Sequence, residues 1–207
     1  MSTLKRKIAT RRPPPGIDLV RETIQQYEEQ LRDAVNEDHS GKRKNELTWR
    51  ITRLHWEKSR YVYDLFWRKK AISRELYEWL GREKVVDMPL MKQWRKQGYE
   101  KLCSLQAIST QNTNFGTTSI CRIPLHKRHH AQLAPAATTG CVSCCSSDKG
   151  APIWWNTPLP DEDELEAEAP GAAAEAAGAG KRKASEADVE DELDEETAKR
   201  LKALQGL

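Results

Sequence analysis

Cysteines are the residues of this chain whose type and spacing best suit chemistry, and there are five of them. Cys141 and Cys144 form a Cys-x-x-Cys pair, a spacing found in many structural zinc sites. Cys103 and Cys121 could supply the other two thiolates of a tetrahedral site, and Cys145 is a fifth candidate. An odd count favours metal ligands or free thiols over disulfides in a reducing compartment. The sequence therefore predicts a site that holds one zinc ion or none.

Basic and aromatic residues are interleaved over residues 60–70. Cations neutralise phosphates and aromatic rings stack on bases, so this stretch suits an RNA partner. The alternatives are that the rings belong to a helix core and that the cations form a solvated face. A second group of cations follows at helical spacing. The candidates for RNA contact are Arg60, Arg68, Lys69, Lys70, Arg74, Lys92, Arg95 and Lys96.

Catalytic motifs are absent from the sequence, which has no Gly-rich phosphate loop, nucleophile elbow or His-Glu-x-x-His pair. Its acidic clusters fall in low-complexity sequence that would not hold carboxylates at a working geometry. We therefore expect a protein that is not an enzyme and has no small-molecule substrate.

The charge is divided between two regions. Residues 1–150 carry 28 Lys+Arg against 16 Asp+Glu, whereas residues 151–207 carry 6 against 15. A basic body favours a polyanionic partner, and an acidic tail of low complexity is typical of disorder. No apolar run is long enough for a membrane span, and the N-terminus does not resemble a secretory leader. We expect a soluble protein with no membrane partner.

Elements that must position these residues are predicted to be mainly helical. Residues 1–16 read as a basic extended arm because three prolines follow the basic residues. Residues 17–100 read as an irregular helical domain, with a long helix near 47–68 and shorter helices before and after it. Asp18, Ser73 and Asp87 are the expected helix caps, and Gly81 and Gly98 the expected ends.

The remainder is expected to be poor in regular structure. Residues 101–148 read as a small, loop-rich, cysteine-containing segment that zinc could stabilise. Residues 149–207 read as an acidic, mostly disordered tail with a possible helix over 186–204. Lys181, Arg182 and Lys183 resemble a nuclear-import signal. Adjacent tryptophans at 154 and 155 would be costly to expose, so docking is expected there.

Four strings of the sequence closely resemble one family, the bud-site-selection splicing-factor family, also called the G-ten family. They are Arg60-Tyr-Val-Tyr-Asp-Leu-Phe-Trp-Arg-Lys-Lys-Ala-Ile-Ser-Arg-Glu-Leu-Tyr77, Lys92-Gln-Trp-Arg-Lys-Gln-Gly-Tyr-Glu-Lys-Leu-Cys103, Thr113-Asn-Phe-Gly-Thr117 and Cys121-Arg-Ile-Pro124. The resemblance spans about residues 1–124. It implies a nuclear subunit of the catalytic spliceosome that associates with small nuclear RNAs, pre-mRNA and Prp-nineteen-related proteins, and supports the RNA core without catalysing splicing.

The chain departs from this family at its metal-binding part, which in the family resembles a nine-cysteine cluster. Ser104, Ala107 and Ser119 stand where the family places cysteine, and residues 125–140 differ from it. Five thiolates cannot build a cluster of several zinc ions, although four suffice for one site. An altered reading of the gene is a second explanation for residues 125–146, but it does not account for all three substitutions.

Two functions follow as hypotheses. The first is a non-catalytic structural subunit of the spliceosome that supports the small nuclear RNA core through basic helical surfaces. The alternative is a free-standing nucleic-acid-binding nuclear co-regulator. Nothing in the sequence presents a helix or aromatic sheet for reading base edges, which argues against the second.

Overall fold

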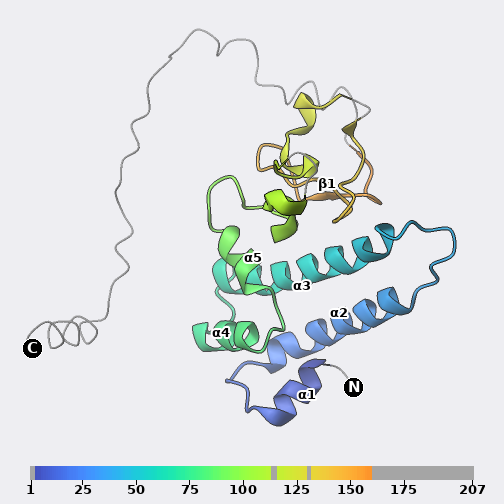
Figure 1. Cartoon of the computed structure of the whole chain (residues 1–207). Helices are drawn as coiled ribbons and strands as arrows, with labels where there is room; N and C mark the ends of the chain where they lie inside the picture. The colour runs from blue at the N-terminus through green and yellow to red at the C-terminus, as the bar shows by residue number, and fades with distance from the viewer. Residues whose placement is uncertain (1–2, 113–115, 130–131, 160–207) are drawn as a thin grey trace, which may run out of the picture. The chain divides into compact units, whose positions relative to one another are not determined.

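The computed structural model describes residues 3–112, 116–129 and 132–159 (Figure 1). Within them the protein is mainly helical, as the sequence predicted. The helices of the N-terminal part are α1 (Thr3–Thr10), α2 (Asp18–Asn36), α3 (Trp49–Trp67), α4 (Arg74–Arg82) and α5 (Met88–Gln93), and the 3-10 turn η1 (Glu46–Thr48) leads into α3.

The C-terminal part of the described chain is built from short pieces. Four 3-10 turns are η2 (Leu105–Ile108), η3 (Thr110–Asn112), η4 (Ile120–Arg122) and η5 (Leu125–Lys127), and two strands are β1 (Cys141–Ser143) and β2 (Ile153–Trp154). The strands pair antiparallel with Cys141 opposite Trp154. Such short elements bury few of their own backbone groups, so this part depends on packing against the helices.

Side-chain caps start two helices as predicted. Ser73 Oγ accepts the Leu76 N–H at 3.2 Å, and Asp87 Oδ1 accepts the Leu90 N–H at 3.0 Å. Both bonds satisfy an amide that has no partner within the helix. The third predicted cap is wrong: Asp18 is the first residue of α2 and pairs with Arg21 instead.

The predicted ends of two helices are also corrected. Gly81 lies inside α4, and the left-handed residue that ends the helix is Lys84, with a φ of 54°. The Val85 N–H donates to the Leu80 carbonyl at 3.0 Å, which closes the last turn. Helix α5 ends at Gln93, well before Gly98.

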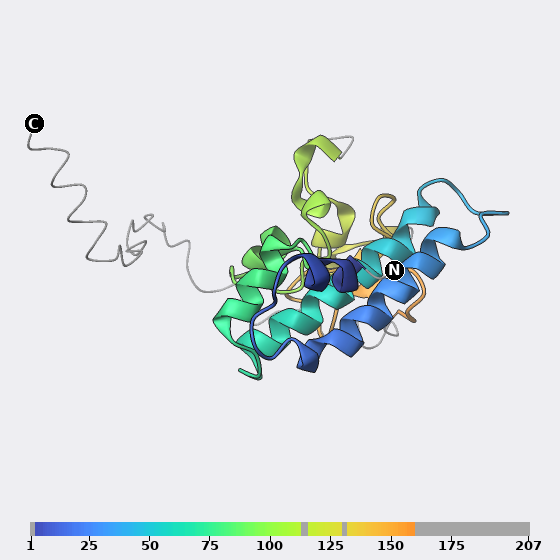
Figure 2. The same ribbon diagram turned by 90° about the horizontal axis from the view of Figure 1, so that it is seen from below.

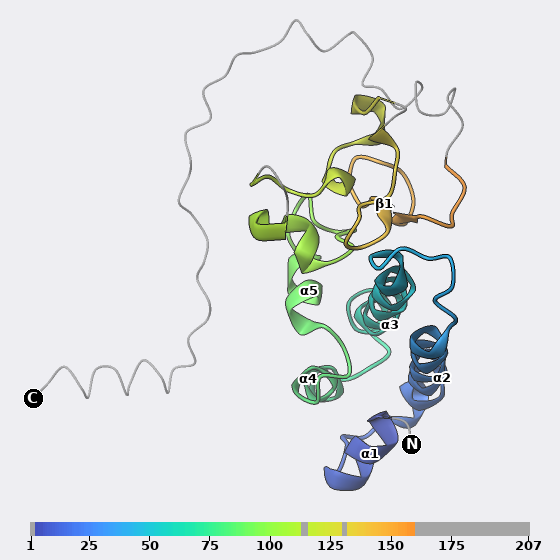
Figure 3. The same cartoon turned by 45° about the vertical axis from the view of Figure 1, so that its right-hand side comes forward.

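Helices α2 and α3 lie side by side and form the centre of the core (Figures 1 and 3). Val20 and Ile24 of α2 and Val62 of α3 are fully buried. Their apolar positions recur at helical spacing, so each helix presents one stripe to its neighbour. Helix α3 carries α2 on one side and the C-terminal part on the other.

Thr3–Thr10 of the N-terminal arm form a helix, which corrects the expectation of an extended arm for this part of 1–16. Helix α1 packs on α2 (Figure 2) through the fully buried Leu4. The Glu28 carboxylate of α2 accepts the Leu4 N–H at 3.1 Å and 3.2 Å. A carboxylate at a helix N-terminus stabilises it by satisfying a free amide and opposing the dipole. The partner lies 24 residues along the chain, so local sequence gives no sign of it.

Residues 149–159, which the sequence assigned to the tail, are part of the folded body. Trp154 is only 3% exposed. Burying an indole removes a large apolar surface from water. This burial favours a folded segment here, although low-complexity sequence follows it. The possible helix over 186–204 and the import signal Lys181–Lys183 lie outside the described residues. In the described part of the chain, no helix is long and apolar enough to cross a membrane.

Candidate metal centre and basic surface

Four cysteines converge on one point. The sulfurs of Cys103, Cys121, Cys141 and Cys144 all lie within 4.8 Å of one another, and all four residues are buried. Two of the separations are 3.9 Å, between Cys103 and Cys121, and 3.7 Å, between Cys144 and Cys121. A zinc ion bound to four thiolates at about 2.3 Å places the sulfurs roughly 3.8 Å apart. The residues present therefore fit one tetrahedral zinc ion.

Separate elements deliver these ligands. Cys141 belongs to β1 and Cys144 directly follows it, so the predicted pair forms a knuckle, while Cys121 lies in η4. The Cys144 N–H donates to the Cys121 carbonyl at 3.0 Å, which joins the two segments. Next to Cys103, the carbonyl of Leu102 accepts two indole N–H groups, at 2.9 Å and 2.8 Å. The helical body thus fixes the position of the first ligand.

Those two indoles belong to Trp56 of α3 and Trp94, which follows α5. Their rings meet edge to face with centroids 5.8 Å apart. Two donors on one carbonyl satisfy both of its lone pairs and leave the Leu102 backbone little freedom.

Electrostatics make the four thiols unequal. Hydrogen bonds from Cys103, the other cluster thiols and Arg122 lower the pKa of Cys144 well below that of an ordinary thiol. The hydrogen bond with Cys121 raises the pKa of Cys103 well above it, and burial does the same for Cys141. Zinc would favour four thiolates and supply folding energy to this segment.

Two arginines hold the backbone around the cysteines. Arg122 Nη1 lies 3.5 Å from Cys144 Sγ, and its Nη2 donates to the Gly98 carbonyl at 2.6 Å. Arg128 Nη1 donates to the Val142 carbonyl at 2.7 Å. Four thiolates and one zinc ion carry a net charge of about −2. The guanidinium groups of the half-buried Arg122 and the buried Arg128 are suited to offset it.

Cys145 is excluded from the site, although sequence reasoning included it. Its Sγ lies 3.1 Å from Ser147 Oγ, and the residue is half-buried. It follows Cys144 directly, so its side chain leaves the chain in a different direction from its neighbour's. In the sequence, the Cys-x-x-Cys spacing is the signal that favours Cys144 over Cys145 as a metal ligand.

The three substituted family positions have other partners in this structure. Ser104 Oγ accepts the Gln106 N–H at 3.3 Å and starts η2. Ala107 is fully buried, and its carbonyl accepts the Ser119 N–H at 2.8 Å. The side chains at positions 104, 107 and 119 are two hydroxyls and a methyl group, none of which is a usual zinc ligand. The described residues offer one metal centre and no cluster of several ions.

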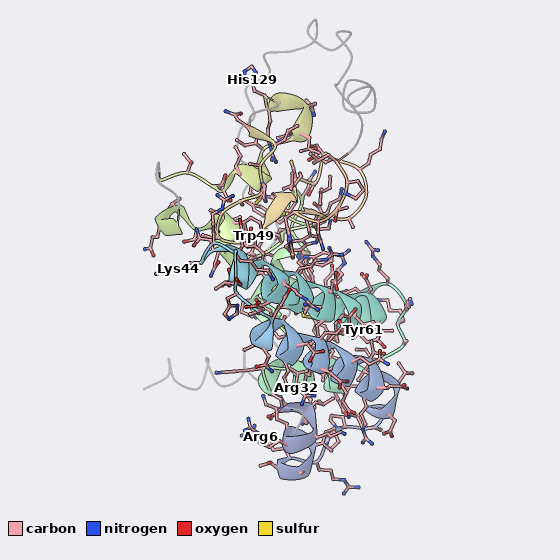
Figure 4. The ribbon with its side chains drawn as sticks, turned by 90° about the vertical axis from the view of Figure 1, so that its right-hand side faces the viewer. Arg6, Arg32, Lys44, Trp49, Tyr61 and His129 are labelled. Carbon is pink, nitrogen blue, oxygen red and sulfur yellow. The ribbon has the colours of Figure 1, made fainter. Side chains whose placement is uncertain are left out.

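Tryptophans fasten the cysteine segment to α3. Trp154 packs edge to face on Trp56 with centroids 6.2 Å apart, and Trp155 packs on Trp49 at 5.8 Å. Trp49, labelled in Figure 4, also donates its indole N–H to the Ala137 carbonyl at 2.8 Å. The predicted docking of the tryptophan pair is thus intramolecular.

Gly140→Ala should destabilise the protein by about 2 kcal/mol more than Gly150→Ala, as measured by thermal unfolding with zinc present. Both glycines have a left-handed backbone, with φ of 69° and 74°. A Cβ at Gly140 would lie 2.5 Å from Trp49 Cγ, whereas one at Gly150 meets nothing within 4 Å. The shared backbone strain cancels and the clash remains. Equal melting temperatures for the two variants would contradict this packing.

Seven of the eight RNA-contact candidates are exposed, and they lie directly after α3, at the start of α4, and in and after α5. They are Arg68, Lys69, Lys70, Arg74, Lys92, Arg95 and Lys96. We call this set the basic surface. Arg68 pairs with Asp64 at 3.3 Å and Arg74 with Glu78 at 2.8 Å. Among the described residues the other five have no carboxylate within salt-bridge distance.

Arg60, the eighth candidate, is half-buried and makes contacts within the protein. Its side chain is only 16% exposed, and it pairs with Asp64 at 3.2 Å. Its Nη1 donates to the Glu100 carbonyl at 2.8 Å, and its guanidinium lies 5.2 Å from the Trp94 ring centroid. Helix α3 turns Arg60 partly toward the interior, where its charge takes part in these contacts; an RNA contact by Arg60 stays a prediction.

Comparison with known proteins places the chain in a class. A family model described as "Pre-mRNA-splicing factor BUD31" matches residues 1–146. A BUD31 homolog of Branchiostoma belcheri is 46% identical over 136 residues, which is 65% of this chain and 94% of the relative. The splicing factor BUD31 of Saccharomyces cerevisiae is 41% identical over 156 residues, 69% of this chain and 99% of the relative.

A further relative is the pre-mRNA-splicing factor cwf14 of Schizosaccharomyces pombe, which is 40% identical over 139 residues, 67% of this chain and 94% of the relative. The class defined by these likenesses is that of pre-mRNA-splicing factors, none of which is named for a catalytic activity. The chain belongs to the BUD31 family, as its resemblance to the bud-site-selection splicing factors indicated. Strand β2, which contains Trp154, and the following Trp155 lie beyond the residues that the family model matches.

Proposed function

We propose that this protein is a nuclear, non-catalytic structural subunit of the spliceosome that supports the small nuclear RNA core. The observation that carries the proposal is the basic surface, which consists of seven exposed cations within residues 68–74 and 92–96. Five of them lack a carboxylate partner in the described residues, so their charge is available to phosphates. The naming of its relatives as pre-mRNA-splicing factors supports the process in which it acts.

The partners proposed are small nuclear RNAs, pre-mRNA and Prp-nineteen-related spliceosome proteins. The RNA contacts are assigned to the basic surface. The cysteine segment is proposed to bind one zinc ion through Cys103, Cys121, Cys141 and Cys144, which fit its tetrahedral geometry. Zinc would there be a structural ion, because four protein ligands leave no open position for a substrate.

Affinity purification of the full chain from nuclei, followed by RNA sequencing, tests this function. Enrichment of small nuclear RNAs that falls steeply with rising salt is the expected result, because phosphate contacts release counterions. Recovery of genomic DNA without small nuclear RNAs would favour the free-standing co-regulator. Retention of the RNAs that ignores salt would instead show that protein contacts hold the chain in place.

Charge reversal of Lys69 and Lys92 together should sharply lower the recovery of small nuclear RNAs. The salt slope of the remaining binding should fall by about 0.7 to 0.9 for each phosphate that the variant no longer neutralises. The matched control reverses Arg6 and Arg32, which are exposed on α1 and α2 and labelled in Figure 4. Both variants change the net charge equally, so an equal loss in the control would show a bulk charge effect and overturn the assignment.

A further inference from the structure

A groove opens at the basic surface between α3, α4 and α5, with a cavity volume of about 550 Å³. This volume is in the range of roughly 300–1,000 Å³ that small-molecule sites occupy. Its lining combines aromatic, apolar and cationic side chains. They are Phe66, Trp67, Arg74, Tyr77, Glu78, Met88, Lys92 and Arg95.

Aromatic rings form a continuous set along the groove. Phe66 stacks on Tyr77 with centroids 4.4 Å apart and an interplanar angle of 20°. Trp67 meets Phe66 edge to face at 5.0 Å. Phe66 and Trp67 are only half-buried, so part of their ring surface faces the groove. Rings held by one another in this way are rigid. The side chains of the groove would therefore lose little conformational entropy when a planar ligand binds.

Two cations lie over the ring of Trp67. The Arg95 guanidinium lies 4.5 Å from the Trp67 ring centroid, and Lys70 Nζ lies 5.6 Å from it. Lys92 adds a third positive charge to the groove. The one carboxylate of the lining, Glu78, is paired with Arg74 at 2.8 Å. The groove therefore carries an excess of positive charge directly beside an aromatic surface.

We propose that this groove receives one unstacked base of a single-stranded RNA, with the surrounding cations holding its flanking phosphates. The proposal rests on the RNA-supporting function above and names the form of RNA that the surface takes. A π-face beside cations is the chemistry with which proteins bind single strands, since every base has a face to stack and every phosphate a charge. In a duplex the bases are stacked inside and cannot reach such a groove.

An acidic peptide is the competing occupant, because it would also be attracted by the cations. Carboxylates would use Lys92 and Arg95 but have no aromatic face of their own to place against the half-buried rings of Phe66 and Trp67. A nucleotide uses both halves of the lining. The observations thus favour RNA, and the peptide becomes an outcome of the test.

The test measures binding of the full-length chain to labelled octauridylate and to inorganic polyphosphate of similar charge. Trp67→Leu should weaken octauridylate binding between about five- and a hundred-fold, the range for losing one base stack, and leave polyphosphate binding unchanged. Trp67→Phe keeps a ring and should keep most of the affinity. Lys92→Gln should weaken both ligands and reduce the salt slope for octauridylate by about 0.7.

Several results would overturn the proposal. Unchanged octauridylate binding by Trp67→Leu would refute the base site while the RNA-supporting function, tested separately by nuclear purification, still stood. Octaglutamate binding that matches octauridylate in strength and in sensitivity to Trp67→Leu would assign the groove to an acidic peptide. Absence of octauridylate binding by the wild-type chain would also refute it.

An unchanged melting temperature for each variant confirms that a loss of binding does not come from a loss of folding.

Discussion

Cys121→Ser is expected to abolish stoichiometric zinc binding, whereas Cys145→Ser should retain one zinc ion per chain. The same substitution is made inside and outside the group of four cysteines. Cys121 Sγ lies 3.9 Å and 3.7 Å from two other cysteine sulfurs, whereas Cys145 is outside the group. A hydroxyl is a poor substitute for a thiolate ligand, and removing one of four ligands destroys the closed tetrahedral site.

Metal analysis of the purified variants measures this directly, and chelation of the wild-type chain supplies a second reading. The binding free energy of a structural zinc ion is about 10–16 kcal/mol in small zinc-binding peptides, and it is largely folding free energy. We therefore expect chelator to lower the melting temperature of the wild-type chain and of Cys145→Ser but not of Cys121→Ser. Two or more zinc ions per wild-type chain, or equal zinc content in the two variants, would contradict a single four-cysteine site.

Trp154→Ala is expected to destabilise the protein by about 3–5 kcal/mol, the usual cost of truncating a buried tryptophan. Trp154 is 3% exposed, and it contacts Trp56, which in turn bonds the carbonyl next to Cys103. The substitution removes apolar burial and loosens the support of a metal ligand at the same time. Leu159→Ala is the matched control, since Leu159 is 40% exposed and little should change.

Denaturant unfolding of both variants measures the difference, and zinc content provides a second readout. Loss of the Trp154 ring should also weaken zinc binding, because β2 pairs with the strand that carries Cys141. Stability within about 1 kcal/mol of the wild type would show that residues 149–159 are not part of the cooperative unit. The measurement thus tests whether a segment outside the family match helps to hold the metal centre.

The sequence predicted the helices well where interactions between residues close in the chain stabilise them. Ser73 and Asp87 cap their helices because a short acceptor side chain bonds the free amide three residues along. The long helix α3 follows from apolar residues at helical spacing. The same reasoning failed for α1, since Glu28 of another helix stabilises its first turn.

The metal centre was likewise predictable in part from local sequence and decided in part by contacts between distant residues. The Cys141–Cys144 spacing indicated a metal knuckle from the sequence alone, because two thiolates at that separation can reach one ion. The sequence offered Cys103 and Cys121 as their partners, and the fold brings these two sulfurs to the pair while Cys145 lies outside the group of four. Those sulfurs meet only because Trp56 and Trp94 fix Leu102 and because Cys144 bonds to the Cys121 carbonyl.

The sequence by itself determined the helical class, the basic body, the family resemblance and the presence of too few cysteines for a multi-ion cluster. These properties depend on composition, on spacing within one turn and on matched strings. The tertiary structure decided that Arg60 is half-buried while Arg95 and Lys92 border an aromatic groove, and that Trp154 closes the cysteine segment on α3. Those outcomes depend on contacts between residues far apart in the chain, for which the spacing of residues along the sequence carries no information.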